Sequence, residues 1–309
     1  MEFCNPKFSF ILLLLLLMSG CNSSDEAYCQ NVTPVEYSEQ SIFVNVSQPI
    51  SILAGSGNML ALACHNCYQN NNASLVESLN IIESAITERA DLIELDITLS
   101  SDKNIAFKVS HENESAGVPF ELLIAQTSLV VSDQLLFIEI KDEIKSLEQV
   151  RAFLNILKAH TNSSGRYAYL NENRFVTLRN IDNNNTLARF RTVLDEADFS
   201  DIKPYVKLSR LYYKKTEAEM YQEITTANQC GFHMVELDLR LGVDVILSLN
   251  AYAENLGMAV NVFTVNQNNV DEAVFALKHD IDIFTIEEND SLQVTGNSLV
   301  SYVKQLINE

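Results

Sequence analysis

Six side chains with acid, base or metal-binding chemistry stand at the ends of apolar runs in this chain. The runs LALACH, LIELDI, NIAFKVSH and LLFIEIK read as buried β-strands. Three carboxylates can hold a divalent cation, two imidazoles can move protons, and one ammonium can neutralise developing negative charge. Together they predict metal-assisted cleavage of a phosphodiester rather than a structural ion-pair cluster. The six residues are His65, Glu94, Asp96, His111, Glu139 and Lys141.

Strand-like and helical patterns alternate from about residue 55 onward. Apolar residues recur at helical spacing over 75–88, 146–159 and 269–279. This alternation predicts an α/β fold, and eight strand–helix units close a (β/α)8 TIM barrel with its chemistry at the carboxyl ends of the strands. The predicted strands span 59–64, 91–98, 104–110, 135–141, 174–179, 204–208, 232–238, 259–265 and 281–286.

The nine predicted strands are one more than such a barrel needs. Only a few residues separate 91–98 from 104–110, which is too short for a parallel crossover. These two runs therefore predict an antiparallel β-hairpin arm after the second strand. Folding the hairpin about Asp102 brings His111 level with Glu94 or its neighbour, and Glu94 shares one strand face with Asp96.

The excess of acidic side chains restricts which binding partners we expect. The chain has 309 residues, with 41 acidic against 21 basic side chains and a net charge of -20. Binding to nucleic acid requires clustered Lys and Arg, so we expect no nucleic-acid partner. The same excess of acid argues against electrostatic attraction to anionic lipid.

The amino terminus has the pattern of an export signal. Residues 10–18 read FILLLLLLM, which is too short to span a bilayer, and Ser19-Gly20-Cys21 follows it. This is similar to a bacterial lipobox, in which the Cys is lipidated. We expect a signal peptide over 1–21, a flexible tether over 22–50 and a TIM-barrel phosphodiesterase domain over 51–309. The expected location is a membrane-anchored lipoprotein, periplasmic or at the cell surface, and otherwise a secreted protein.

The cysteines form no dense disulfide framework in the sequence. Cys64 and Cys67 make a C-x-x-C around His65, but no second pair stands nearby as a zinc site would need. Packed small residues are the favoured interpretation, although an exported protein can form a disulfide.

Several segments together resemble the glycerophosphodiester phosphodiesterase family. ADLIELD at 90–96 is similar to its G-A-D-x-I-E-x-D, VSHE at 109–112 to its strand ending in His-Asp, and IEIK at 138–141 to its I-E-I-K. FTVN at 263–266 and IDIFT at 281–285 resemble its W-T-V-N and its closing V-D-G-I-x-T-D strand. The resemblance covers about 58–290.

This resemblance implies a function and a role for each residue. It implies a barrel of the PLC-like phosphodiesterase type that hydrolyses glycerophosphodiesters to an alcohol and glycerol phosphate. Glu94, Asp96 and Glu139 would bind one Ca²⁺ or Mg²⁺, His65 and His111 would be the acid/base pair, and Lys141 would contact the phosphate. Hard oxygen ligands suit these ions, and imidazoles titrate near the operating pH.

The chain departs from this pattern at several positions. Asn66 stands where the family has the Arg of His-Arg-Gly, Phe263 replaces Trp, and Glu287 follows where a closing Asp is expected. The short segment between His111 and Glu139 indicates a reduced substrate cap.

Asn66 also indicates an alternative function. His65-Asn66 followed by Tyr68 resembles phosphatidylinositol-specific phospholipase C, in which the Asn is a fourth Ca²⁺ ligand. That enzyme would act on a phospholipid head group and release a cyclic phosphate. A third alternative, from another class, is a catalytically inactive barrel lipoprotein.

Two further observations concern strand ends. Glu236 and Asp238 repeat the spacing of Glu94 and Asp96, and we interpret them as a solvated strand end. Arg179 and Lys207 are the candidates to replace the missing phosphate-binding Arg.

Overall fold

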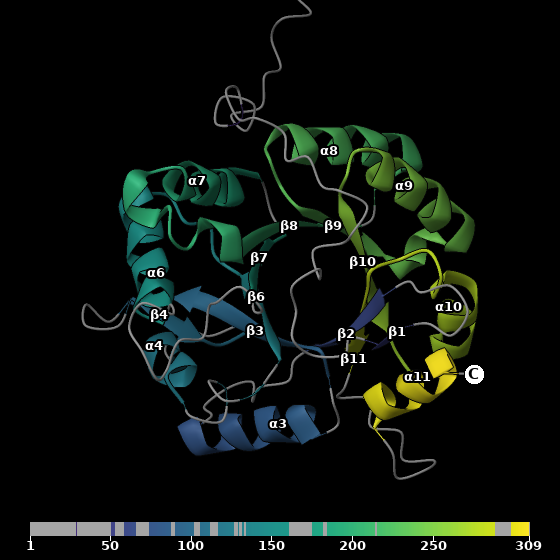
Figure 1. Ribbon diagram of the computed structural model, residues 1–309, viewed down its shortest axis with the longest axis horizontal. Helices are drawn as coiled ribbons and strands as arrows, with labels where there is room; N and C mark the ends of the chain where they lie inside the picture. Colours follow the sequence, from purple (N-terminus) through teal and green to yellow (C-terminus); the bar gives the residue numbers. More distant parts are fainter. Residues whose placement is uncertain are drawn as a thin grey trace, which may run out of the picture.

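The computed structural model describes residues 29, 51–52, 59–65, 74–87, 90–101, 106–111, 117–126, 129, 132, 134–160, 175–181, 184–213, 215–287 and 298–308. Eight parallel strands form a closed barrel, in which each strand pairs with the next and the last pairs with the first. Figure 1 looks into this ring, with the helices around its outside. The predicted TIM barrel is therefore confirmed. Its strands are β2 (Met59–His65), β3 (Leu92–Leu99), β6 (Leu135–Ile140), β7 (Val176–Asn180), β8 (Val206–Tyr212), β9 (Met234–Asp238), β10 (Ala259–Val265) and β11 (Ile283–Glu287).

The helices cover the outer face of the barrel because each has one apolar stripe. In α6, Val150, Phe153, Leu154 and Leu157 are buried, and Ser146 caps the first turn by accepting a hydrogen bond from the Gln149 amide. The three helices predicted from the sequence are α3, α6 and α10. The described helices are α3 (Leu75–Thr87), α4 (Phe120–Ile124), α6 (Leu147–Ala159), α7 (Asn184–Leu194), α8 (Glu217–Gln229), α9 (Val243–Asn255), α10 (Val270–Leu277) and α11 (Leu299–Asn308), with 3₁₀ turns η2 (Ala197–Phe199), η3 (Lys203–Tyr205) and η4 (Leu239–Leu241).

The predicted hairpin arm is present. β4 (Phe107–Val109) pairs antiparallel with β3, with Val109 opposite Ile97, and β5 (Val118–Pro119) extends the arm. The Ser110 amide donates to the Asp96 carbonyl at 2.9 Å, so the next residue, His111, arrives beside the carboxylates of β3. β1 (Ser51–Ile52) pairs antiparallel with the start of β2.

The interior of the barrel divides into an apolar floor and a polar upper part. A separate apolar cluster gathers residues from the first half of the strands, among them Ala61, Leu92, Phe137 and Ile283. Side chains on one face of a strand recur every second residue. The inward-facing positions therefore run from this apolar floor to the charged residues nearer the carboxyl ends.

Disulfide bonding differs from the sequence-based interpretation. Cys29 is bonded to Cys230, with 4.6 Å between the Cα atoms. Cys64 is also disulfide-bonded, and its partner lies outside the described residues. The interpretation of Cys64 as a packed thiol is wrong, because a buried cysteine and a bonded one look alike in sequence. The predicted tether over 22–50 falls outside the described residues except at Cys29, which this bond fixes to the barrel.

None of the helices described in the structure is both long enough and apolar enough to cross a membrane. The predicted signal peptide lies outside the described residues.

Candidate active site

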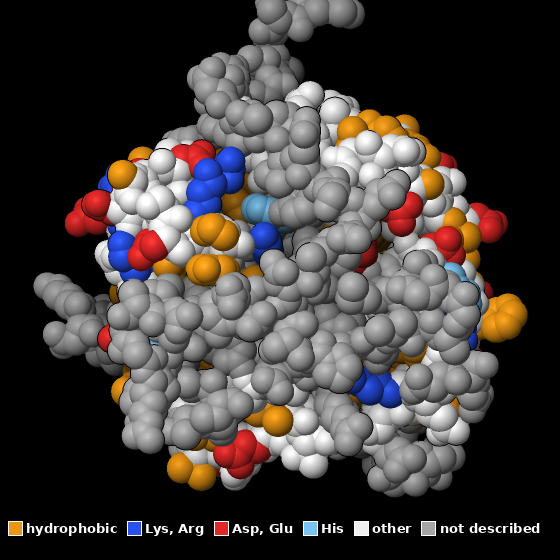
Figure 2. All heavy atoms as spheres, viewed as in Figure 1, with side chains coloured by type: hydrophobic (Ala, Val, Ile, Leu, Met, Phe, Trp, Pro, Cys, Tyr) orange, Lys and Arg blue, Asp and Glu red, His pale blue; other side chains and the backbone are white. Residues whose placement is uncertain are grey.

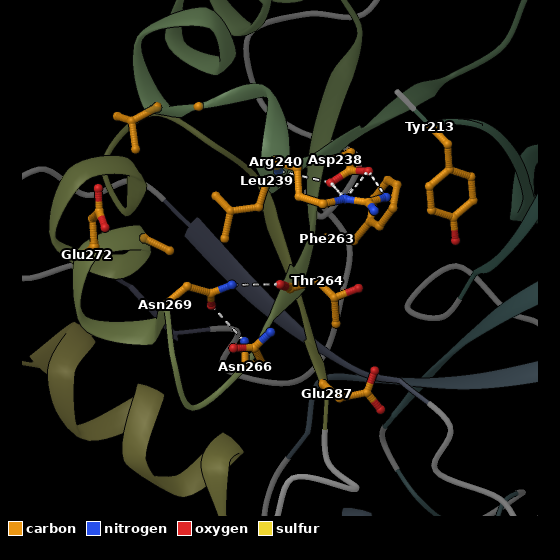
Figure 3. A pocket seen from close by; sticks show the side chains of 13 residues that line it. Tyr213, Asp238, Leu239, Arg240, Phe263, Thr264, Asn266, Asn269, Glu272 and Glu287 are labelled. Carbon is orange, nitrogen blue, oxygen red and sulfur yellow. Dashed lines mark hydrogen bonds and ion pairs between the residues drawn. The ribbon is translucent and has the colours of Figure 1, made fainter. Parts of the chain in front are cut away.

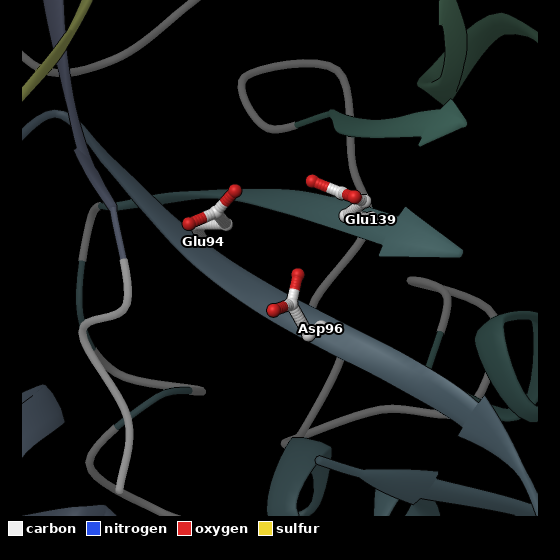
Figure 4. A group of neighbouring side chains, drawn as sticks. All are labelled: Glu94, Asp96 and Glu139. Carbon is white, nitrogen blue, oxygen red and sulfur yellow. The ribbon is translucent and has the colours of Figure 1, made fainter. Parts of the chain in front are cut away.

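Three buried carboxylates lie together on two neighbouring strands (Figure 4). Glu94 and Asp96 belong to β3 and Glu139 to β6, and the register of the two strands places Asp96 directly opposite Glu139. One oxygen of each lies within 4.8 Å of the others. We refer to these three residues as the carboxylate triad. Oxygen ligands converging in this way fit a hard divalent cation such as Mg²⁺ or Ca²⁺.

The first histidine is held between two carboxylates. His65 ends β2, and its Nδ1 lies 2.8 Å from Oε2 of Glu287, the residue opposite it on β11. Its Nε2 lies 3.5 Å from Oε2 of Glu94. Burial lowers the pKa of His65, but the charges of Glu94 and Glu287 outweigh burial and raise it to about 9. The ring is therefore protonated at neutral pH, with its orientation fixed by Glu287.

The second histidine comes from the hairpin arm. His111 follows β4, and its Nε2 lies 3.7 Å from Oδ2 of Asp96. The ring is about a third exposed, so solvent and ligands can reach it. The two histidines approach the triad from different strands, as a pair that must act on opposite sides of one reacting group would.

Lys141 provides a cation next to the triad. Its ammonium lies 2.8 Å from Glu139 Oε1 and 3.7 Å from Asp96 Oδ2. Burial lowers the pKa of Lys141, but the neighbouring carboxylates outweigh burial and raise it. This lysine therefore stays charged at neutral pH and can bind an anionic phosphate oxygen.

Arg179 forms the centre of a deeper charged layer. Its guanidinium lies 2.5 Å from Glu94, 3.1 Å from Glu236 and 3.6 Å from Glu139. Its side chain is only 2% exposed, and it lies over the Phe137 ring at 4.5 Å. Burial lowers the pKa of this guanidinium, but the three carboxylates outweigh burial and raise it. The sequence predicted that Arg179 replaces the missing phosphate-binding Arg. In the structure its guanidinium pairs with buried carboxylates next to the triad, and contact with a phosphate stays a prediction.

Glu236 is buried, and its interpretation as a solvated strand end is wrong. It accepts hydrogen bonds from Ser209 at 2.7 Å and Asn261 at 2.8 Å, and Asn261 also bonds Thr285. The network runs across β8, β9, β10 and β11 inside the barrel. Its signal was available in the sequence, because these residues occupy the same inward-facing strand positions as the triad.

Asp238 is buried as well, where the sequence predicted solvation. Its carboxylate accepts hydrogen bonds from the Nε of Arg240 at 2.8 and 2.9 Å, one to each oxygen. Lys207, by contrast, is the second residue of β8 and does not lie at the carboxyl end of that strand. The sequence placed Lys207 near a strand end, and this placement is wrong because β8 extends to Tyr212 and not to 208 as predicted.

A cavity of about 460 Å³ opens beside the site, between β9, β10 and α10 (Figure 3). Glu287 lines this cavity and also holds His65, so the cavity and the catalytic centre are adjacent. On the face seen in Figure 2, described acidic and basic side chains are both scattered over the visible surface.

The structure brings together all six side chains from which the chemistry was predicted. They are His65, Glu94, Asp96, His111, Glu139 and Lys141. Asn66, the possible fourth ligand, lies outside the described residues. Glu287 was seen in the sequence only as a departure from the expected closing Asp, yet it holds His65.

Solved structures share the barrel fold. A glycerophosphodiester phosphodiesterase from Parabacteroides distasonis is 13% identical, with a TM-score of 0.52 over 80% of this chain and 96% of its own. KGPDC from Streptococcus mutans is 15% identical, with a TM-score of 0.51 over 80% and 96%. A glycerophosphodiester phosphodiesterase from Thermotoga maritima is 17% identical, with a TM-score of 0.47 over 74% and 90%. No family model and no curated protein matches the sequence.

The first two of these likenesses establish the fold. Because a phosphodiesterase and KGPDC have the same barrel, the fold does not by itself decide the reaction. That choice depends on the side chains at the carboxyl ends of the strands.

Proposed function

We propose that this protein is a metal-dependent phosphodiesterase that hydrolyses glycerophosphodiesters to an alcohol and glycerol phosphate. The observation that carries the proposal is the convergence of the carboxylate triad, two histidines and Lys141 at one end of the barrel. This set matches the needs of phosphodiester cleavage, and the fold is one that a phosphodiesterase uses.

The triad supplies the ligands for one divalent cation, Ca²⁺ or Mg²⁺. With that ion bound, its charge would help to hold and polarise the phosphate. Lys141 binds a non-bridging phosphate oxygen and offsets the negative charge that develops there. Arg179 lies beneath, where it holds Glu94 and favours the ionised form of Glu139: burial raises the pKa of Glu139, but Arg179 and Lys141 bring it below its ordinary value.

The histidines move the protons. In the proposed reaction His111 accepts a proton from the attacking water, whose oxygen forms a bond to phosphorus. The bond from phosphorus to the leaving alcohol breaks, and His65 donates a proton to that oxygen. Glu287 suits His65 to this role, because a carboxylate on Nδ1 stabilises the protonated ring and keeps Nε2 directed into the site.

The test is hydrolysis by purified protein of glycerophosphocholine, glycerophosphoinositol and phosphatidylinositol, each with Ca²⁺, Mg²⁺ or EDTA. We expect release of glycerol phosphate that EDTA abolishes. His111→Ala and Glu94→Gln should each lower kcat at least about 100-fold, since each removes a group that acts in the transition state. Full activity in either variant would refute the assignment.

Other products would identify other functions. A cyclic inositol phosphate would favour a reaction like that of phosphatidylinositol-specific phospholipase C. A folded protein that turns over none of these substrates with any ion would favour an inactive barrel.

We also propose that the protein is exported and anchored in a membrane through lipid on Cys21. Support comes from the apolar run and the Ser-Gly-Cys that follows it. The Cys29–Cys230 disulfide is consistent with an oxidising compartment. Metabolic labelling with palmitate tests the anchor, and Cys21→Ala should abolish the label.

A further inference from the structure

Glu236 is a buried carboxylate that does not belong to the carboxylate triad. It occupies an inward-facing position of β9, and its side chain has no exposed surface. Burying a charge in this way is costly unless the charge is paired and hydrogen-bonded. The contacts that Glu236 makes therefore show what the carboxylate does in the barrel, and they connect it to the candidate metal site.

Neutral side chains hold Glu236 in one orientation. Ser209 donates to its Oε1 at 2.7 Å, and the Asn261 amide donates to its Oε2 at 2.8 Å. Asn261 is fixed in turn, because it donates to the Thr285 hydroxyl at 2.9 Å and accepts from it at 3.1 Å. Burial raises the pKa of Glu236, and Ser209, Asn261 and Arg179 act against burial. The carboxylate is therefore held with Oε2 directed at Arg179.

One nitrogen of Arg179 divides its contacts between Glu236 and the triad. Nη2 lies 3.1 Å from Oε2 of Glu236 and 3.6 Å from Oε2 of Glu139. The other nitrogen, Nη1, lies 2.5 Å from Oε1 of Glu94. Glu94 and Glu139 stand on the neighbouring strands β3 and β6 (Figure 4). The guanidinium thus contacts two members of the triad, but its Nη2 lies closer to Glu236 than to Glu139.

A divalent cation at the triad has to share two carboxylates with this guanidinium. Like charges repel, and their repulsion is stronger in the protein interior than in water. Arg179 therefore opposes the ion, and it does so more strongly the closer it lies to Glu94 and Glu139. Glu236 reduces this opposition, because it draws Nη2 away from Glu139 and because its negative charge offsets the charge of the guanidinium.

We propose that Glu236 sets the affinity of the triad for its divalent cation by holding Arg179 away from Glu139. Glu236 is a positioning residue, because it acts through Arg179 and supplies no ligand of its own. This inference rests on the proposed function, since it requires an ion at the triad. Its effect is on ion binding, which can be measured with no substrate present.

Calorimetric titration of the purified, EDTA-treated and dialysed protein with Ca²⁺ and with Mg²⁺ at about pH 8 measures the effect. Glu236→Gln keeps the shape of the side chain and removes its charge, so it should raise the Kd of each ion at least about 10-fold. Asp238→Asn is the matched control, because it removes a charge from the same strand whose partner is Arg240. It should change Kd at most about threefold, because Arg240 is exposed and solvent screens its charge.

A second set of variants tests whether Glu236 acts through Arg179. Arg179→Met should bind each ion more tightly than the wild type, and adding Glu236→Gln to it should change Kd less than about threefold. Circular dichroism checks the folding of each variant. Where Arg179→Met does not fold, Ser209→Ala decides the route. It keeps every charge but removes one donor that fixes Glu236, so it should raise Kd about 2- to 5-fold.

Equal Kd values for the wild type and Glu236→Gln overturn the inference while the proposed function stands. An equally large loss in Asp238→Asn overturns it as well, because the effect then belongs to any charge on β9. The same holds if Glu236→Gln keeps its full effect in the Arg179→Met background, or if Ser209→Ala, as the deciding variant, leaves Kd unchanged. If the wild type binds neither ion, the metal dependence of the proposed function fails, and the inference fails with it.

Discussion

At the scale of single residues, the contact between His65 and Glu287 sets the orientation and the protonation of the His65 ring. The carboxylate holds Nδ1 at 2.8 Å and helps to raise the pKa of His65 to about 9. A histidine that must give a proton to the leaving oxygen loses activity as pH rises through its pKa. In the proposed reaction, Glu287 would therefore control the pH at which activity falls on the alkaline side.

Glu287→Gln should lower kcat about 10- to 100-fold, the usual cost of removing a group that orients a catalytic one. The pKa of His65 should fall because the amide carries no charge, so the alkaline limb of the pH–rate profile should move to lower pH. Glu287→Asp keeps the charge and should retain a profile closer to that of the wild type. Superimposable profiles for the wild type and Glu287→Gln would show that Glu287 does not act through His65.

Arg179 balances buried negative charge that would otherwise oppose folding. Arg179→Met leaves three buried carboxylates without this cation, so we expect a loss of about 3–5 kcal/mol in the free energy of unfolding. A divalent ion at the triad can replace part of the missing charge. Ca²⁺ or Mg²⁺ should therefore raise Tm more in the variant than in the wild type.

Thermal unfolding with each ion and with EDTA measures this difference. The double variant Arg179→Met, Glu236→Met removes one carboxylate together with its partner and should recover part of the lost stability. Equal shifts of Tm by metal in the wild type and in Arg179→Met would contradict the role of Arg179 as the internal counter-charge.

At the scale of elements, the strands could be predicted from the sequence, because the residue type at every second position determines which face of the strand is apolar and which carries the charged side chains. β3 carries Leu92, Glu94 and Asp96 on one face, which passes from the apolar floor to the triad. The hairpin followed from the short connection between the predicted strands 91–98 and 104–110, which allows only an antiparallel return. Local patterns of this kind fix the type of an element and the direction of its side chains.

Contacts between distant strands could not be predicted in the same way. Glu236 was interpreted as solvated although its position on β9 faces the barrel interior, and only its ion pair with Arg179, two strands away on β7, has no local signal. The Cys29–Cys230 bond joins positions 201 residues apart, and no spacing rule identifies such a pair. The end of β8 was also placed too early, which misplaced Lys207.

Gly117 maintains the arm that carries His111. It adopts φ +98°, and a Cβ there would lie 2.3 Å from the Val109 carbonyl oxygen. Gly117→Ala should therefore cost at least about 2 kcal/mol of stability and displace β4, lowering kcat with it. Gly242 has a similar φ of +89° with nothing within 4 Å of the added Cβ, so Gly242→Ala should lose only about 1 kcal/mol.

Chemical denaturation of both glycine variants separates backbone strain from steric displacement. Equal losses of stability would mean that φ alone is responsible and that the close approach to Val109 is tolerated.

His233 makes the pairing of β8 with β9 sensitive to acid. Its Nδ1 accepts the Leu208 amide at 3.0 Å, and burial lowers its pKa to about 3. The unfolded chain binds a proton near pH 6.5 and the folded one does not, so this contribution is complete above pH 6.5. It is lost as pH falls toward 3, by about 1.4 kcal/mol per pH unit.

His233→Asn places an amide oxygen where Nδ1 accepts and removes the titration. The slope of unfolding free energy against pH should therefore be smaller in the variant between pH 6 and 4, by about the amount given above. Urea unfolding of both proteins at pH 4, 5, 6 and 7 measures the difference. Parallel curves would show that His233 takes up a proton in the folded state.

At the scale of the whole molecule, the Cys29–Cys230 bond decides which end of the barrel meets a membrane. Cys230 follows α8 and precedes β9, so it lies at the amino-terminal end of the barrel, opposite the triad. Seven residues lie between Cys21 and Cys29, and the eight residue-to-residue steps reach at most about 28 Å. The seven residues of β2 alone rise about 23 Å, and loops add to that height. If Cys21 carries the proposed lipid, the floor of the barrel would therefore face the membrane and the carboxylate triad would face solvent.

Energy transfer to acceptor-labelled lipid tests this orientation in the lipidated protein on vesicles. A dye at Gln229, at the end of α8, should transfer strongly, and a dye at Glu272, in α10 beside the cavity, should transfer weakly. Insertion of about 20 Gly/Ser residues after Asn22 keeps the disulfide but adds roughly 25 Å of mean reach, so the two efficiencies should converge. Cys29→Ser, which removes this attachment to the barrel, should have the same effect. Equal transfer from both dyes in the wild type would contradict the orientation. If the orientation holds, the substrate reaches the site from solution, which favours a soluble glycerophosphodiester over a phospholipid of the anchoring leaflet.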